Sequence, residues 1–152
     1  MTKINLSIII ISFNTKQILL DCLDSILKHT TGLSYEIIVV DNGSTDGSLQ
    51  SLKGYSSKNS KVILVDAEKN IGFGCGNNLG AKKAKGEYLL FLNSDTSIFD
   101  NSITRSYQKL KQLKNIGAFS CKLQNIDGSL QPSGGHFPTL GNLLAWQFFI
   151  DD

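Results

Sequence analysis

The sequence predicts an α/β fold with a mainly parallel sheet flanked by helices, and two observations support this. Short apolar runs rich in β-branched residues alternate with helical stripes from the first residues onward. A helix between two strands implies a right-handed crossover, which places those strands parallel in one sheet. The Asp127-Gly128 dipeptide adds a late antiparallel hairpin. We therefore expect a single α/β domain over residues 1–152.

The first half of the chain predicts two strand–helix units. Leu6–Phe13 is a continuous apolar run, as in a strand that is covered on both faces. Lys16–His29 places its apolar residues on one helical stripe, and Gly32 follows as a stop. Glu36–Val40 is the second strand. The turn Asp41–Ser44 then offers N-cap residues to a second helix.

The second half continues this alternation and then ends in a hairpin. Its expected elements are strand Val62–Val65, helix Gly76–Lys85, strand Tyr88–Leu92, helix Ser102–Lys114, strand Gly117–Leu123 and the returning strand Ser129–Gln131. The last segment, from Leu140 to Asp152, carries large apolar side chains that need something to pack against. We therefore expect the domain to be C-terminally incomplete, with its remainder beyond Asp152.

Composition and charge exclude several classes of protein. Apolar residues make up 41% of the chain and charged residues 18%, which is a globular composition. The net charge of +2, with mixed signs, gives no electrostatic reason to expect a nucleic-acid partner. The three cysteines are isolated in sequence, which fits neither a zinc site nor a disulfide framework and favours a reducing compartment. Leu6–Phe13 is far shorter than the roughly 20 residues of a membrane span. A cytoplasmic location is expected.

Amides, hydroxyls and carboxylates follow four of the expected strands. These residues are Ser12–Asn14, Asp41–Ser44, Asn70 with Gly72, and Asn93–Asp95. Any one of them is more simply explained as a turn former or helix cap. Turn chemistry alone, however, would place as many polar residues at the opposite edge of the sheet. Because ligands of open α/β sheets bind outside the carboxyl ends of the strands, we predict a ligand site at this edge.

Asn93–Asp95 indicates a cation site. Asn70–Gly80 is a glycine-rich run that opens a helix. Mg²⁺ takes oxygen ligands and is usually held by one or two carboxylates plus substrate phosphates. Glycines let backbone approach a ligand, and a helix N-terminus favours anionic groups. The G-x-G-x-G-x-x-x-G spacing differs from the dinucleotide fingerprint, so a dinucleotide-dependent oxidoreductase is a disfavoured alternative.

Taken in order over about the first 130 residues, these segments resemble glycosyltransferase family 2, whose members have the GT-A fold. The matching pieces are Ile8–Asn14, Glu36–Asp46, Asn70–Phe73, Asn77–Gly80 and Tyr88–Asp95. The glycine run and Gln131–Gly135 look most like the rhamnosyltransferase-type branch. The resemblance implies that residues 1–152 are the N-terminal, nucleotide-sugar-binding portion of such an enzyme, with the acceptor-binding part absent.

The resemblance also implies roles by position. Phe13 would lie against the nucleotide base, and Ser12 and Asp41 would contact base or ribose. Asn93–Asp95 stands at the family's Asp-x-Asp metal motif with Asn in first place, which leaves Asp95 as the carboxylate ligand of Mg²⁺ or Mn²⁺. The expected nucleotide-sugar contacts are Ser12, Phe13, Asn14, Asp41, Asn42, Asn70, Gly72, Asn77, Asn93 and Ser94.

The implied reaction is inverting transfer from a dTDP- or UDP-sugar, with rhamnose one option, to a glycan or lipid-linked acceptor in cell-surface polysaccharide synthesis. The acceptor hydroxyl needs a general base, for which a carboxylate is the natural choice. Asp151 and Asp152 come too soon, so the base is expected beyond residue 152 and this chain alone is expected to be inactive. Peripheral association with the inner face of the membrane is expected through further segments. A non-catalytic nucleotide-binding module, or a truncated pseudoenzyme of the same fold, is the alternative.

Overall fold

The computed structural model describes residues 3–125 and 127–132. The chain divides into two compact units, Met1–Lys114 and Asn115–Asp152. The first unit contains a parallel sheet with its helices, and the described part of the second contains a short hairpin.

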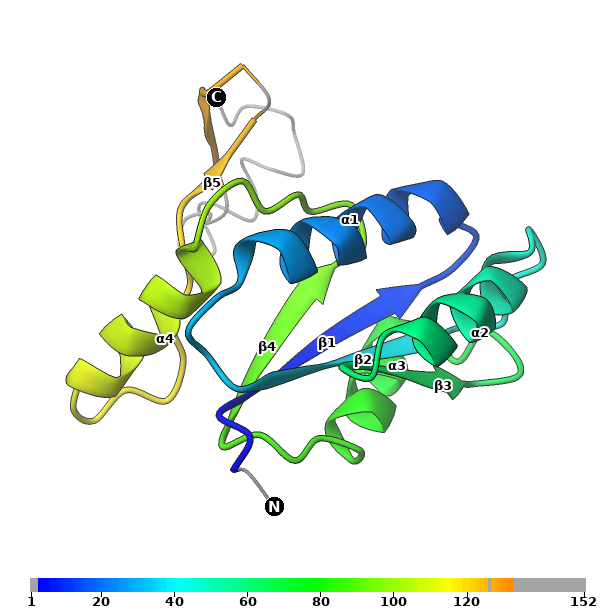
Figure 1. Ribbon diagram of the computed structural model, residues 1–152, viewed down its shortest axis with the longest axis horizontal. Coiled ribbons are helices and arrows are strands. Elements are labelled where there is room, and N and C mark those ends of the chain that lie inside the picture. Colours follow the sequence, from blue (N-terminus) through cyan, green and yellow to red (C-terminus); the bar gives the residue numbers. More distant parts are fainter. Residues whose placement is uncertain (1–2, 126, 133–152) are drawn as a thin grey trace, which may run out of the picture. The chain divides into compact units, whose positions relative to one another are not determined.

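A four-stranded sheet forms the centre of the first unit (Figure 1). Its strands are β1 (Leu6–Ser12), β2 (Tyr35–Asp41), β3 (Val62–Asp66) and β4 (Tyr88–Asn93), in the order β3-β2-β1-β4. All three strand pairs are parallel, as predicted. The chain moves outward from β1 through β2 to β3 and then returns to the other side of β1. The gap between β1 and β4 is therefore the topological switch point, where ligands of such sheets bind.

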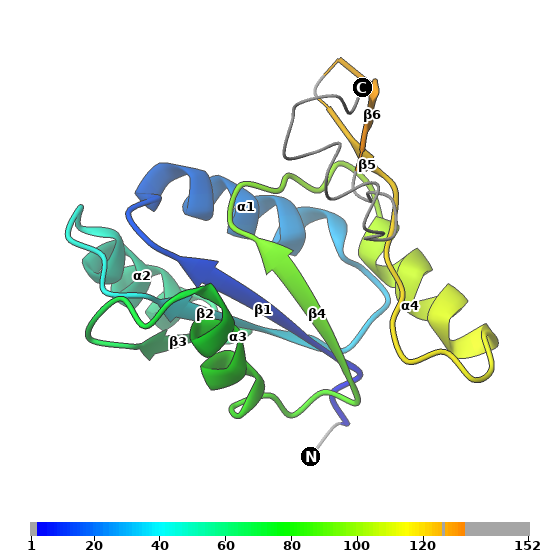
Figure 2. The same ribbon diagram turned by 180° about the vertical axis from the view of Figure 1, so that it is seen from behind.

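Helices cover both faces of this sheet, which confirms the predicted layering (Figures 1 and 2). They are α1 (Lys16–His29), α2 (Ser48–Lys58), α3 (Phe73–Ala81) and α4 (Ser102–Gln112). Residues of α1, α2 and α4 share one core with the sheet, and α3 packs on the opposite face. In the described part of the chain, no helix is long and apolar enough to cross a bilayer.

The main core lies between α1 and the central strands. Ile8 and Ile10 of β1 are fully buried against the apolar stripe of α1, which includes Leu23 and Ile26. Full burial of a side chain of this size stabilises the fold by about 1.5–3 kcal/mol. The apolar stripe of α1 and the β-branched run of β1 therefore share one buried interface.

On the opposite face, glycines bring α3 close to the sheet. A Cβ atom on Gly80 would lie 2.6 Å from Ile9 Cγ2 and 3.2 Å from Val40 Cγ2. A Cβ atom on Gly76 would lie 3.3 Å from the Ile11 side chain. The expectation that this glycine run serves ligand approach is therefore wrong for Gly76 and Gly80, which serve helix–sheet packing.

At the amino edge of the sheet, polar groups bind one another. Glu36 is buried, and its Oε1 atom accepts the Ser7 hydroxyl at 2.6 Å and the Lys85 amide at 2.6 Å. The Ser7 hydroxyl also accepts the Gly86 amide at 2.8 Å. This cluster joins the α3–β4 connection to β1 and β2, and the sequence alone did not single it out.

Several predicted boundaries were wrong. The helix expected at Gly76–Lys85 begins at Phe73 and ends at Ala81, and Lys85 is used in the Glu36 cluster. The strand expected at Gly117–Leu123 is also wrong, because residues 117–122 are exposed and belong to no strand. Only Leu123–Gln124 (β5) pairs, antiparallel, with Leu130–Gln131 (β6).

The turn between β5 and β6 confirms the hairpin prediction. Gly128 has a φ of +83°, a left-handed conformation that glycine adopts without steric cost. The Asp127 carboxylate accepts the Ser129 amide at 2.9 Å, a side-chain turn typical of aspartate.

Candidate functional site

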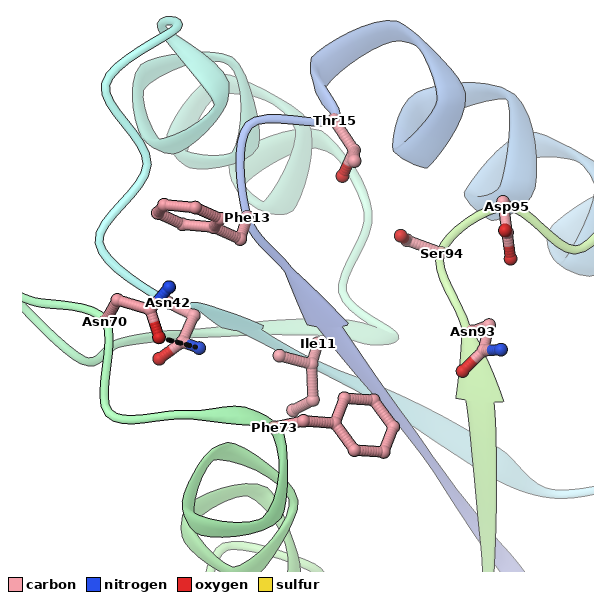
Figure 3. A pocket seen from close by; sticks show the side chains of 9 residues that line it. All are labelled: Ile11, Phe13, Thr15, Asn42, Asn70, Phe73, Asn93, Ser94 and Asp95. Atoms are coloured by element: carbon pink, nitrogen blue, oxygen red, sulfur yellow. Dashed lines mark hydrogen bonds between the residues drawn. The ribbon is translucent and has the colours of Figure 1, made fainter. Parts of the chain in front are cut away.

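A cavity of about 330 Å³ opens at the carboxyl ends of β1 and β4 (Figure 3). Small-molecule sites span about 300–1,000 Å³, so this cavity lies at the lower end of that range. It is lined by Ile11, Phe13, Thr15, Asn42, Asn70, Phe73, Asn93, Ser94 and Asp95. Six of these were predicted site residues, and the structure brings them together at the predicted edge.

The loop between β1 and α1 forms one wall. Phe13 is half-exposed and lines the cavity, whereas Ser12 is buried and shares a 3.1 Å hydrogen bond with the Thr15 hydroxyl. Asn14 adopts a φ of +55°, and its side-chain oxygen accepts the Thr45 amide at 2.7 Å. Ser12 and Asn14 therefore brace the loop that presents Phe13, and neither lines the cavity.

Asp46 links this loop to the start of α2. Its Oδ2 atom accepts the Lys16 amide at 3.2 Å, and its Oδ1 atom accepts the amide and hydroxyl of Ser48. The Ser48 hydroxyl, followed by these amides, holds the pKa of Asp46 below its ordinary value. The predicted N-cap role of Asp41–Ser44 is wrong, because α2 begins at Ser48 with Gly47 as its N-cap.

Asp41 is fully buried at the end of β2, next in sequence to the lining residue Asn42. Its Oδ2 atom accepts the Ser44 amide at 3.0 Å, but its Oδ1 atom has no partner within the described residues. The hydroxyl groups of Thr30 and Tyr35 are also buried without a partner within the described residues. Tyr35 is at the amino end of β2, opposite to Asp41. A buried acceptor without a partner costs about 1–3 kcal/mol, so the Asp41 carboxylate is ready to accept an N–H donor.

A pair of asparagines joins the loops that follow β2 and β3. Asn42 Nδ2 donates to Asn70 Oδ1 at 3.1 Å, the bond drawn dashed in Figure 3, and Asn42 Oδ1 accepts the Ile71 amide at 2.9 Å. The Gly72 amide also donates to Asn70 Oδ1, at 2.9 Å. Gly43 allows this approach, because a Cβ atom there would lie 2.6 Å from the Lys69 carbonyl carbon.

The sequence missed Ile11, Thr15 and Phe73 as lining residues. Ile11 and Phe73 resemble core residues in the sequence, yet Phe73 is 64% exposed at the first position of α3. An aromatic residue within a glycine-rich run was the one available indication. Gly72 and Asn77, which were predicted to contact ligand, lie outside the lining, and Asn77 Nδ2 donates to the Phe73 carbonyl at 3.1 Å.

The opposite wall is the turn that follows β4. The Thr96 amide donates to the Asn93 carbonyl at 3.2 Å and closes this turn. Figure 3 shows Asn93, Ser94 and Asp95 across the cavity from Phe13 and Asn42. Asn93 and Asp95 are exposed, so both present oxygen atoms that a ligand can reach.

These oxygens alone do not make a complete set of metal ligands. Within the part of the chain that the structure describes, no three His, Cys, Asp or Glu side chains gather as metal ligands. One carboxylate, one hydroxyl and one amide fit Mg²⁺ or Mn²⁺ when substrate phosphates complete the coordination. The residues present therefore fit a cation that arrives with a phosphorylated ligand.

Comparisons of sequence and fold relate this chain to known proteins. The sequence profile described as glycosyl transferase family 2 matches residues 7–144. A poly(ribitol-phosphate) beta-glucosyltransferase of Bacillus spizizenii is 37% identical over 125 residues, which are 81% of this chain and 20% of that protein. This chain thus spans about a fifth of the length of that curated relative.

Two solved structures share the fold. The mannosyltransferase PcManGT from Pyrobaculum calidifontis, in complex with GDP-Man and Mn²⁺, has a TM-score of 0.72 and 20% identity, over 82% of this chain and 36% of that one. S. aureus TarS 1–349, in complex with UDP-GlcNAc, has a TM-score of 0.64 and 22% identity, over 82% of this chain and 42% of that one. At these identities the likeness establishes the GT-A fold alone.

Proposed function

Because this chain belongs to glycosyl transferase family 2, we propose that its cavity binds the donor of the transfer, a UDP- or dTDP-sugar with Mg²⁺ or Mn²⁺. One observation carries the proposal: the carboxyl edge of the sheet holds an aromatic wall and an exposed carboxylate in one cavity, with a buried unpaired acceptor at the end of the neighbouring strand β2. In this proposal the aromatic wall contacts the base and the unpaired acceptor binds the ring N–H of that base. The exposed carboxylate binds the cation that accompanies the diphosphate.

The base side of the cavity offers partners for the uracil or thymine of the proposed donor. Uracil and thymine each carry one ring N–H, which is the donor that the free Asp41 oxygen lacks. Phe13 offers an apolar face for the ring. Asp41 is buried and does not line the cavity, so this contact requires the Asp41–Ser44 turn to open toward the ligand.

The diphosphate side depends on Asp95. Asp95, with Asn93 and Ser94 beside it, would hold the cation, which would offset the negative charge that builds as the nucleoside diphosphate leaves. The mannosyltransferase structure with GDP-Man and Mn²⁺ and the TarS structure with UDP-GlcNAc support this class of ligand.

For the whole protein, we infer inverting transfer of a hexose or rhamnose to a glycan or lipid-linked acceptor at the inner face of the membrane. The name of the Bacillus relative, a poly(ribitol-phosphate) glucosyltransferase, supports a role in cell-surface polysaccharide synthesis. The general base belongs to a part of the protein beyond residue 152 in this proposal, so the 152-residue chain binds donor without turning it over. Turnover of a sugar nucleotide by this chain would contradict that part.

Calorimetry of the chain with UDP, dTDP, GDP and NAD, each with and without Mn²⁺, tests the donor assignment. We expect UDP or dTDP to bind more tightly than GDP, and the Mn²⁺-containing titrations to show the higher affinity. Preferential binding of NAD, or no binding of any nucleoside diphosphate, would overturn the proposal.

A further inference from the structure

Two side chains of helix α1 form hydrogen bonds to the two ends of the turn that carries Asp95. Ser25 Oγ accepts the Ile98 amide at 3.0 Å and donates to the Cys22 carbonyl, within α1, at 2.7 Å. One turn earlier on the same helix, the Cys22 thiol donates to the Asn93 carbonyl at 3.9 Å. Residues Asn93–Ile98, here called the cation loop, are therefore bonded to two successive positions on one face of α1.

These bonds set the position of Asp95. No hydrogen bond within the described residues is made by the Asp95 carboxylate, so its place follows from the backbone of the cation loop. The buried Ile98 side chain anchors the end of the loop in the core. The Ile98 amide, however, has the Ser25 hydroxyl as its partner. Removal of that hydroxyl frees the loop just after Asp95 while it leaves the apolar anchor in place.

We propose that Ser25 is a positioning residue for the cation: it holds the cation loop so that the Asp95 carboxylate faces the diphosphate. The inference rests on the proposed function, in which Asp95 binds Mg²⁺ or Mn²⁺. Ser25 does not line the cavity, and its effect passes through the Ile98 amide.

The test measures the Mn²⁺ gain, defined as the dissociation constant for UDP without Mn²⁺ divided by that with saturating Mn²⁺. In the 152-residue chain, Ser25→Ala should lower this gain by about 2- to 10-fold, the effect of one neutral hydrogen bond. Its affinity for UDP without Mn²⁺ should equal that of wild type, because Ser25 does not line the cavity. Ser25→Thr, which keeps the hydroxyl, should restore the gain.

Ser57→Ala is the matched control. Ser57 Oγ donates to the Gly54 carbonyl on α2 at 2.8 Å, the same local bond that Ser25 makes on α1, but it holds no loop of the cavity. Its Mn²⁺ gain should equal that of wild type. Thermal unfolding of both variants shows whether they are equally folded.

The outcomes separate the inference from the proposed function. An unchanged gain in folded Ser25→Ala, or an equal loss in Ser57→Ala, overturns the positioning role alone. Absence of any Mn²⁺ gain in wild type overturns the proposed function and this inference with it. If Ser25→Ala does not fold, Ser25→Cys replaces it, because a thiol of similar size is a weaker acceptor and should give a smaller loss in the same direction.

Discussion

The Asp46 carboxylate accepts the backbone amide of Lys16 at 3.2 Å, across the two loops that bound the cavity. Its other oxygen accepts the amide of Ser48 at 3.0 Å. One negative charge therefore lies at the N-terminal ends of both α1 and α2, where helix dipoles favour it. Because these helices follow the loops that carry Phe13 and Asn42, Asp46 holds together two loops on the same side of the cavity.

The Asp46 carboxylate should make the folded protein more stable at neutral pH than at acid pH. Its pKa in the folded protein lies below the ordinary value of 3.8, chiefly because of the Ser48 hydroxyl. A depressed carboxyl pKa contributes stability above the unfolded pKa, and that contribution is lost as pH falls through the folded pKa. We expect wild type to unfold at a higher temperature than Asp46→Asn at pH 7, and the difference to shrink below pH 3.8. A difference in melting temperature that does not change with pH would contradict this account.

Gly80→Ala should destabilise the fold by about 1–3 kcal/mol, because the added methyl group overpacks the contact of α3 with Ile9 and Val40. Gly54→Ala in α2 is the matched control, since nothing lies within 4 Å of its added Cβ atom. That control should stabilise α2 by up to about 1 kcal/mol through helix propensity. Urea unfolding measures both changes. Equal effects of the two substitutions would refute the close packing of α3.

The three cysteines should react at different rates. Burial raises the pKa of the Cys22 thiol to about 12, and the negative charge of Asp95 adds to this. Cys75 and Cys121 are exposed. Since the thiolate is the reactive form, two thiols should be modified quickly at pH 8 and Cys22 only slowly. Mass spectrometry of the alkylated chain identifies the sites, and fast modification of Cys22 would show that the cation loop does not cover it.

Strands and their polar ends were predictable because their patterns are local. Ile8–Ile11 is wholly β-branched, and a stripe of period 3.6 follows it in Lys16–His29, so β1 and α1 appear where expected. Gly117–Leu123 has a smaller share of apolar residues and no β-branched one, and it pairs with no strand over most of its length. A sequence pattern does not show whether a partner strand is within reach.

The sequence did not predict which polar residues line the cavity and which hold its loops in place. Asn42 lines the cavity while Asn14 braces a loop, although both are asparagines at the end of a strand. Amide and hydroxyl side chains serve both purposes, and only tertiary contacts separate them. Ile11 and Phe73 were missed for a related reason, because apolar residues of a strand or helix are ordinarily core residues.

Substitution of Asp95 tests the central claim most directly. Asp95→Asn removes the one carboxylate among the described residues that line the cavity and keeps its size. Asp100→Asn is the control, because Asp100 follows in the same connection but pairs with Arg105 at 2.6 Å and does not line the cavity. The Mn²⁺ gain for UDP, measured by calorimetry, compares these two variants with wild type. We predict that Asp95→Asn abolishes the gain and leaves metal-free binding of UDP unchanged, while Asp100→Asn retains it. A full Mn²⁺ gain in Asp95→Asn would contradict the assignment of Asp95 to the cation.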